Sequence, residues 1–250
     1  MNRMRNLWLT GVAAAIAIAA VAASQASNRA GRDALMRADP ERSLADPRLA
    51  PVALRIGRTQ FADHCASCHQ DGRPDRGRGV PDLTDGEHLY GTGSVAEIEQ
   101  IVLYGIRSGS PRGWNLAAMP AYASAKPSAS EPVPAMTPRA IADVTQYLMQ
   151  RRGNPADAPA AGRGAILFAG SGGCWDCHAA DGGGNDAIGA PSLIDDVWLY
   201  GDGSAASIAR SIAYGRHGFS PAFKSKLSPV EARAVAVYVA SLSQPQRIAR

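Results

Sequence analysis

The sequence predicts an all-α fold with two small helical domains in tandem behind an N-terminal helical segment. The first observation is an internal repeat: PDLTDGEHLYGTGS at 81–94 matches PSLIDDVWLYGDGS at 191–204, 110 residues later. The second is helical periodicity, because apolar residues recur at three- and four-residue intervals after Thr137-Pro138 and after Ser228-Pro229. Together these patterns predict one helical unit that is built twice.

The N-terminal segment, residues 1–26, has the pattern of an anchor or a signal sequence. Two arginines precede an uncharged stretch from Leu7 to about Ala26. A membrane-spanning helix needs roughly 20 apolar residues, and a signal peptide begins in the same way before a small-residue cleavage site. Both interpretations export the rest of the chain. We expect a retained anchor on the periplasmic side of the cytoplasmic membrane, with a soluble periplasmic protein after cleavage as the alternative.

The remaining chain divides into a tether, two domains and a linker. Residues 27–55 are expected to be an irregular tether, 56–150 the first domain, 151–162 a polar linker with Pro and Gly, and 163–245 the second domain. Each domain is expected to contain a helix before a cysteine motif, a middle helix and a terminal helix. A domain of about 85–90 residues lies near the lower size limit for a stable core.

The cysteines occur as two C-x-x-C pairs, each followed directly by a histidine. The residues are Cys65, Cys68 and His69, and Cys174, Cys177 and His178. Disulfides, redox dithiols or zinc would not explain both histidines, and the pairs are too far apart for one zinc ribbon. C-x-x-C-H is the attachment sequence for haem c, in which both thiols reach one porphyrin edge and the histidine binds the iron. We therefore predict two covalently bound haems c, whose buried porphyrins add apolar area to each core.

Charge and motifs exclude several other functions. The net charge is +4, and the basic residues are scattered without interleaved aromatics, so we expect no nucleic-acid partner. No Ser-His-Asp set, carboxylate pair or further metal cluster is evident, and we assign no catalytic residue.

Several longer sequence segments resemble those of one protein family. FADHCASCHQDG, PDLTDGEHLYG, MPAYA, DGGGNDAIGAPSLIDDVWLYG and AYGRHGFSPAF are similar to the dihaem subunit III of cbb3-type cytochrome c oxidases, from Arg58 to Leu242. The resemblance implies tandem cytochrome c-like domains outside the cytoplasmic membrane on a helical anchor. They would relay single electrons from a donor cytochrome to the oxidase core. It also implies His–Met ligation, so that Met119 joins His69 on the first haem, with Met136 as the rival position.

The second repeat lacks the matching methionine. Ser220-Pro221 replaces Met-Pro, and no methionine follows Met149. Three options remain for the sixth ligand of the second haem: His217, a deprotonated Lys224 or Lys226, or an open position. Imidazole lowers the potential relative to a thioether, so the second haem is expected to have the lower potential.

Two functions fit this sequence. The first is a non-catalytic electron carrier that serves a membrane-bound respiratory oxidoreductase. The alternative is a haem enzyme or gas sensor that uses a five-coordinate second haem. The sequence identifies neither the donor nor the acceptor.

Overall fold

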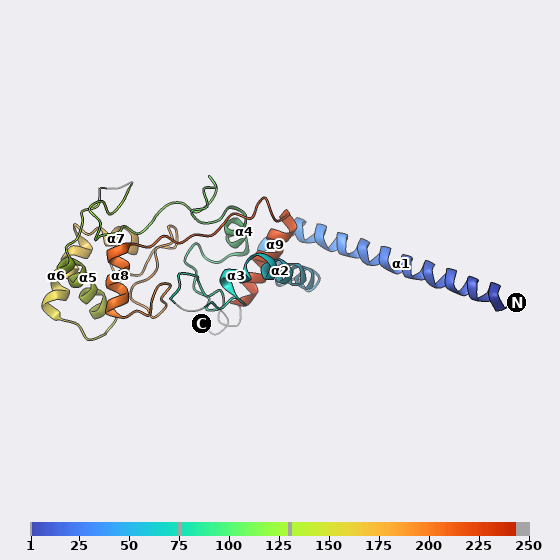
Figure 1. The fold of residues 1–250 in the computed structure, drawn as a ribbon, viewed down its shortest axis with the longest axis horizontal. Coiled ribbons are helices and arrows are strands. Elements are labelled where there is room, and N and C mark those ends of the chain that lie inside the picture. Colours follow the sequence, from blue (N-terminus) through green and yellow to red (C-terminus); the bar gives the residue numbers. More distant parts are fainter. Residues whose placement is uncertain (1, 75–76, 130–131, 244–250) are drawn as a thin grey trace.

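The computed structural model describes residues 2–74, 77–129 and 132–243, with side chains from residue 16 onwards, as helices joined by long loops (Figure 1). Within these ranges the only β-type pairing consists of isolated bridges, which confirms the all-α prediction. The helices are α1 (Asn2–Arg37), η1 (Pro40–Arg42), α2 (Ala50–His64), α3 (Ala66–His69), α4 (Val95–Tyr104), α5 (Pro138–Arg151), α6 (Ala158–Ala169), α7 (Cys174–His178), α8 (Ala205–Tyr214) and α9 (Pro229–Leu242).

The helix starts expected from the sequence are confirmed. The Thr137 side chain accepts a hydrogen bond from the backbone N–H of Ala140, and Pro138 occupies the first helical position. Ser228 and Glu231 form a capping box at the start of α9. Such caps satisfy backbone N–H groups that lack a partner inside the helix. Local sequence therefore fixes where α5 and α9 begin.

The segment expected to be an irregular tether is largely helical. α1 continues to Arg37, and α2 begins at Ala50. Leu35 and Leu49 are buried in a cluster with residues of α2 and α9, so this part of the chain packs on the folded body. Figure 1 shows α1 extending away from that body. None of the helices in the described ranges combines the length and apolar character that a membrane-crossing helix requires.

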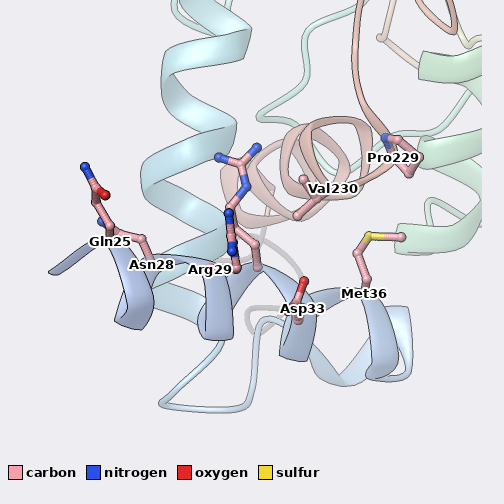
Figure 2. A pocket seen from close by; sticks show the side chains of 8 residues that line it. Gln25, Asn28, Arg29, Asp33, Met36, Pro229 and Val230 are labelled. Carbon is pink, nitrogen blue, oxygen red and sulfur yellow. The ribbon is translucent and has the colours of Figure 1, made fainter. Parts of the chain in front are cut away.

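A pocket lies where the end of α1 meets the start of α9 (Figure 2). Its volume is about 520 Å³. Arg32 of α1 lies 3.5 Å from the carboxylate of Glu231 in α9, and this pair stabilises the junction. The pocket contains no residue of either cysteine motif. The lining residues are Gln25, Asn28, Arg29, Arg32, Asp33, Met36, Pro229 and Val230.

The helices form two separate groups, which do not follow the two sequence repeats. The first unit consists of α2, α3, α4 and α9, and the second unit consists of α5, α6, α7 and α8 (Figure 1). α9 packs on α2 and α4, whereas α5 packs on α6 and α8. The sequence analysis expected each terminal helix to close its own domain. In the structure each repeat instead supplies its terminal helix to the other repeat's unit.

The two helix crossings are built in the same way. A Cβ atom at Gly57 of α2 would lie 2.2 Å from the carbonyl oxygen of Ala234 in α9. A Cβ atom at Gly164 of α6 would lie 2.0 Å from the carbonyl oxygen of Asp143 in α5. Glycine therefore allows both close contacts. An aromatic pair adjoins each crossing, with ring centroids 5.3 Å apart: Phe61 with Tyr238, and Phe168 with Tyr147.

Candidate haem sites

The cysteine motifs lie on short helices at equivalent places in the two units. Cys65 is the residue between α2 and α3, and Cys174 begins α7. All four cysteines are described, and none forms a disulfide. Burial raises the pKa of the Cys65 thiol and of the Cys174 thiol to about 11, because apolar surroundings disfavour the thiolate.

The cysteines are not part of a zinc site in the described structure. Across the described ranges, no group of three or more His, Cys, Asp and Glu side chains is placed to hold a metal ion. Two thiols followed directly by an imidazole fit covalent attachment of a haem instead.

His178 is placed as the proximal ligand of such a haem. The ring is buried, and its Nδ1 atom lies 2.8 Å from the carbonyl oxygen of Pro191. A carbonyl oxygen only accepts, so Nδ1 carries the proton and Nε2 remains available for iron. Burial lowers the pKa of His178, although the Pro191 backbone opposes this shift. The neutral imidazole is the form that binds a metal.

His69 lies at the equivalent place in the first unit, where its ring is half-buried. Burial lowers its pKa, and here the backbone of Pro81, the repeat equivalent of Pro191, opposes the shift. Its Nδ1 atom is buried and makes no hydrogen bond within the described residues. The two imidazoles, each behind two cysteines and beside an equivalent proline, fit a pair of haem c sites.

The surroundings of Trp198 also fit a haem bound in the second unit. Its indole N–H is buried without a hydrogen-bond partner in the described structure, and the guanidinium of Arg152 lies 4.7 Å from the ring centroid. A buried indole N–H usually has a partner. A propionate of a haem held by Cys174 and Cys177 would supply an acceptor. The sequence analysis did not connect Arg152 with Trp198, because nothing local in the sequence links them.

The structure places Met119 with the second unit and does not bring it together with His69. Its backbone N–H donates to the carbonyl oxygen of Arg216 at 3.1 Å. Its side chain packs on a cluster around α5, α6 and α8 that also contacts Cys174. Three residues later, the Tyr122 hydroxyl donates to the carbonyl oxygen of Gly172, two residues before Cys174. The sequence analysis assigned Met119 to the first haem and missed Tyr122.

The other candidate ligands are also placed. Met136 is buried in the same cluster as Met119. His217 is exposed. Lys224 lies over the ring of Tyr104, with 5.4 Å between Nζ and the ring centroid, and so belongs to the first unit. Lys226 lies over Phe223 at 5.7 Å from Nζ to the centroid. Neither lysine therefore lies beside His178.

The two units contact each other through repeated loops next to the proximal histidines. The ring of Tyr200 lies against Gly79, and the ring of Tyr90 lies against Gly189, the repeat equivalent of Gly79. The backbone N–H of Gly79 also donates to the carbonyl oxygen of Leu199 at 2.8 Å. Pro81 and Pro191 each follow two residues after these glycines, so the loops beside both imidazoles are held against the opposite unit.

Comparison with known proteins agrees with this geometry. The cytochrome c family model matches residues 54–152. The model for cytochrome c oxidase, cbb3-type, subunit III matches residues 159–239. The chain therefore contains two cytochrome c-type domains in tandem, which implies covalently bound haem c.

Curated relatives cover most of this chain. The cbb3-type cytochrome c oxidase subunit FixP is 38% identical in Azorhizobium caulinodans and 37% identical in a Bradyrhizobium species, over 80% and 79% of this chain. The chain spans 64% and 63% of the length of those two relatives. The subunit CcoP of Rhodobacter capsulatus is 36% identical over 88% of this chain and 72% of its own length. This chain belongs to the CcoP/FixP family of cbb3-type cytochrome c oxidase subunits.

Proposed function

We propose that the chain is a dihaem electron-transfer subunit that relays single electrons between a donor cytochrome and the core of a cbb3-type oxidase. Cys65 and Cys68 would attach one haem and Cys174 and Cys177 the other. His69 and His178 would be the proximal ligands. The observation that carries this proposal is the placement of an imidazole after each cysteine pair beside an equivalent proline, with His178 buried and His69 half-buried.

The bound haems would supply the one-electron chemistry, while the chain orients and tunes them. The hydrogen bond from His178 to Pro191 holds the ring orientation and increases the basicity of the other nitrogen. The reciprocal Tyr90–Gly189 and Tyr200–Gly79 contacts hold the two sites in one relative placement. A fixed placement suits transfer between haems, because no domain motion is then needed before each step.

Family membership and the N-terminal helix support a proposal for the location and the partners. The named relatives are oxidase subunits, which supports a complex with an oxidase core. We propose that the N-terminal segment holds the chain at the cytoplasmic membrane, although α1 does not itself meet the requirement for a membrane-crossing helix, and that both units lie on the periplasmic side. A donor cytochrome would dock on this side and reduce one of the two haems.

The test begins with the full chain produced in a host that matures c-type cytochromes. We expect a red protein with two covalent haems per chain. Its reduced form should be reoxidised by the oxidase core in the presence of oxygen. The double substitution Cys65→Ala/Cys68→Ala should halve the haem content. A colourless, stably folded product with unmodified cysteines would contradict the proposal.

A haem enzyme or gas sensor remains the second candidate because of one observation. Ser220 stands where the other repeat has Met119, so one haem lacks a thioether ligand. Such a haem could bind a small ligand such as CO. Rapid and complete CO binding at one haem, together with no electron transfer to the oxidase core, would favour this candidate over the relay.

A further inference from the structure

Arg107 makes three hydrogen bonds to segments that lie far apart in the sequence. Its Nη1 atom donates to the carbonyl oxygen of Ala117 at 2.6 Å, and its Nε atom donates to the carbonyl oxygen of Gly218. Its Nη2 atom donates to the hydroxyl oxygen of Tyr90 at 2.7 Å. The residue is half-buried. One side chain therefore connects residues of both repeats.

The two carbonyl acceptors belong to loops that lie beside different cysteine motifs. The first loop, residues 115–123, packs in a cluster that includes Cys174. The second loop, residues 216–224, packs in a cluster that includes Cys65. Because Arg107 bonds both loops, it fixes the position of one loop relative to the other.

The third acceptor connects Arg107 to the surroundings of a proximal histidine. The buried ring of Tyr90 lies against Gly189. Two residues later, the carbonyl oxygen of Pro191 accepts the hydrogen bond from His178. Arg107 therefore bonds a loop beside Cys174 directly, and through Tyr90 it also contacts the loop that orients the imidazole.

The backbone of Arg107 has a conformation that residues other than glycine rarely adopt. Its φ angle is 49°. In the described ranges, the only other non-glycine residues with a positive φ are Gln70 and Ala179, and each directly follows a proximal histidine. Such a backbone costs free energy and occurs chiefly at functional sites, where the surroundings hold it in place. This feature groups Arg107 with the haem sites.

The charge of Arg107 has no acidic partner within the described residues, since its acceptors are two carbonyl oxygens and one hydroxyl. A second guanidinium, that of Arg216, lies 4.5 Å from the ring centroid of Tyr200. Burial raises the pKa of Tyr200, and the charges of Arg216 and Arg107 oppose this shift. Both charges therefore act where the two units meet. A fixed positive charge favours ferrous haem, because the ferric state carries one more positive charge.

The second repeat does not contain a matching arginine. The equivalent residue is His217, whose side chain is exposed and whose φ angle is not positive. The next residue is Gly218, where a Cβ atom would lie 2.9 Å from Nη2 of Arg107. The second repeat thus leaves room for the arginine of the first, and one guanidinium serves both loops.

We infer that Arg107 is a positioning residue shared by the two haem sites, which holds both loops in place and raises the reduction potential of both haems. This inference rests on the proposed function, which supplies the haems. The planar guanidinium suits this role, because it bonds several acceptors in fixed directions and always carries its charge. A shared charge shifts both potentials in the same direction, so it sets the level at which the pair accepts electrons.

The first measurement is the reduction potential of each haem in the full, haem-loaded chain. Arg107→Gln should shift the reduction equilibrium of both haems about tenfold toward ferric, which is ~59 mV for a one-electron couple. Arg107→Lys keeps the charge and should restore most of this shift. The control is Arg112→Gln, which removes an exposed guanidinium that lies 4.1 Å from the ring centroid of Tyr104. Solvent and salt screen this charge, so both potentials should stay unchanged.

The second measurement is amide hydrogen exchange, which reports the positions of the loops. The backbone N–H of Met119 donates to Arg216 in the first loop's contact, and that of Ser220 donates to Ile106 in the second. Neither glutamine nor lysine can bond both loops at once. Both substitutions at Arg107 should therefore accelerate exchange of the two amides by at least about tenfold, the effect of losing one charge-assisted hydrogen bond.

Several results would overturn the inference. Unchanged potentials in Arg107→Gln, a shift confined to one haem, or faster exchange in only one loop would each do so. If Arg107→Gln does not take up both haems, the exchange rates of Arg107→Lys decide by the same criterion. A wild-type chain without covalent haem contradicts the proposed function, whereas a two-haem chain whose potentials do not respond to Arg107 contradicts only this inference.

Discussion

Gly162 and Gly164 lie two residues apart in α6 and have opposite surroundings. A Cβ atom at Gly164 would collide with the backbone of Asp143, whereas nothing lies within 4 Å of a Cβ atom at Gly162. We expect Gly164→Ala to lower the free energy of unfolding by about 1–3 kcal/mol, because the crossing of α5 and α6 must open. Gly162→Ala should raise it by up to about 1 kcal/mol, because alanine favours the helix.

Chemical denaturation of the haem-loaded protein, followed by circular dichroism, measures both values. The two substitutions add the same methyl group to the same helix, so helix propensity cancels in the comparison. Equal effects of Gly162→Ala and Gly164→Ala would contradict the close crossing. A similar decrease in the free energy of unfolding for Gly57→Ala would show that the helices of the first unit also cross too closely to admit a Cβ atom.

At the scale of the helix, sequence and structure agree on where α5 and α9 begin and on which face they bury. The apolar residues that recur at three- and four-residue intervals after Thr137-Pro138 are Ile141, Val144 and Leu148, and all three side chains are buried. The partner of that stripe could not be predicted. α2 and α6 present equivalent surfaces, each with a glycine and an aromatic ring, and the choice depends on ion pairs such as Glu99 with Arg233, 134 residues apart.

The same limit, that local sequence does not contain long-range contacts, explains which residues of the haem sites could be predicted. Each C-x-x-C-H motif is local, so the proximal histidines and the attachment cysteines could be proposed from the sequence. Met119 reaches its place through a loop that crosses to the other repeat, and no local pattern contains that information. The sequence also predicted a tether where α1 continues, because its alanines and arginines carry no clear apolar stripe until Leu35 contacts α2 and α9.

The exchange of terminal helices predicts how the chain behaves when it is cut. A protease site that replaces Asn154-Pro155-Ala156, in the short loop between α5 and α6, separates the two repeats covalently. We expect both fragments to elute together in size-exclusion chromatography on dilution and to retain both haems. Each unit then still contains helices from both fragments, so dissociation would expose the cores of both units.

The uncut protein and a cut sample in denaturant are the controls for this experiment. If the terminal helices closed their own repeats, only the loop contacts around Tyr90 and Tyr200 would join the fragments. Separation of two folded, haem-bearing fragments on dilution would therefore contradict the exchange.

For the whole molecule, sharing of elements couples the stability of the two haem sites. The first repeat supplies α5 to the second unit, and the second repeat supplies α9 to the first. Loss of either unit releases a chain segment that the other unit needs for its own core. Two domains that were merely adjacent would lack this coupling, and each could unfold while the other kept its haem in place.

We therefore expect one cooperative unfolding transition, with coincident midpoints for both haems and for the helical signal. Glu99→Ala leaves Arg233 buried without its partner in the first unit and should lower the free energy of unfolding by about 3–5 kcal/mol. The midpoints of both haems should shift together, because α9 cannot detach without loosening the repeat that holds His178.

Arg48→Ala, which removes an exposed pair with Asp46, is the control and should change the free energy of unfolding by less than about 1 kcal/mol. Haem absorbance in each redox state, recorded against guanidinium concentration, separates the two sites. A shift confined to the first haem would show that the units unfold independently, and the shared construction of the two sites would then have no energetic consequence.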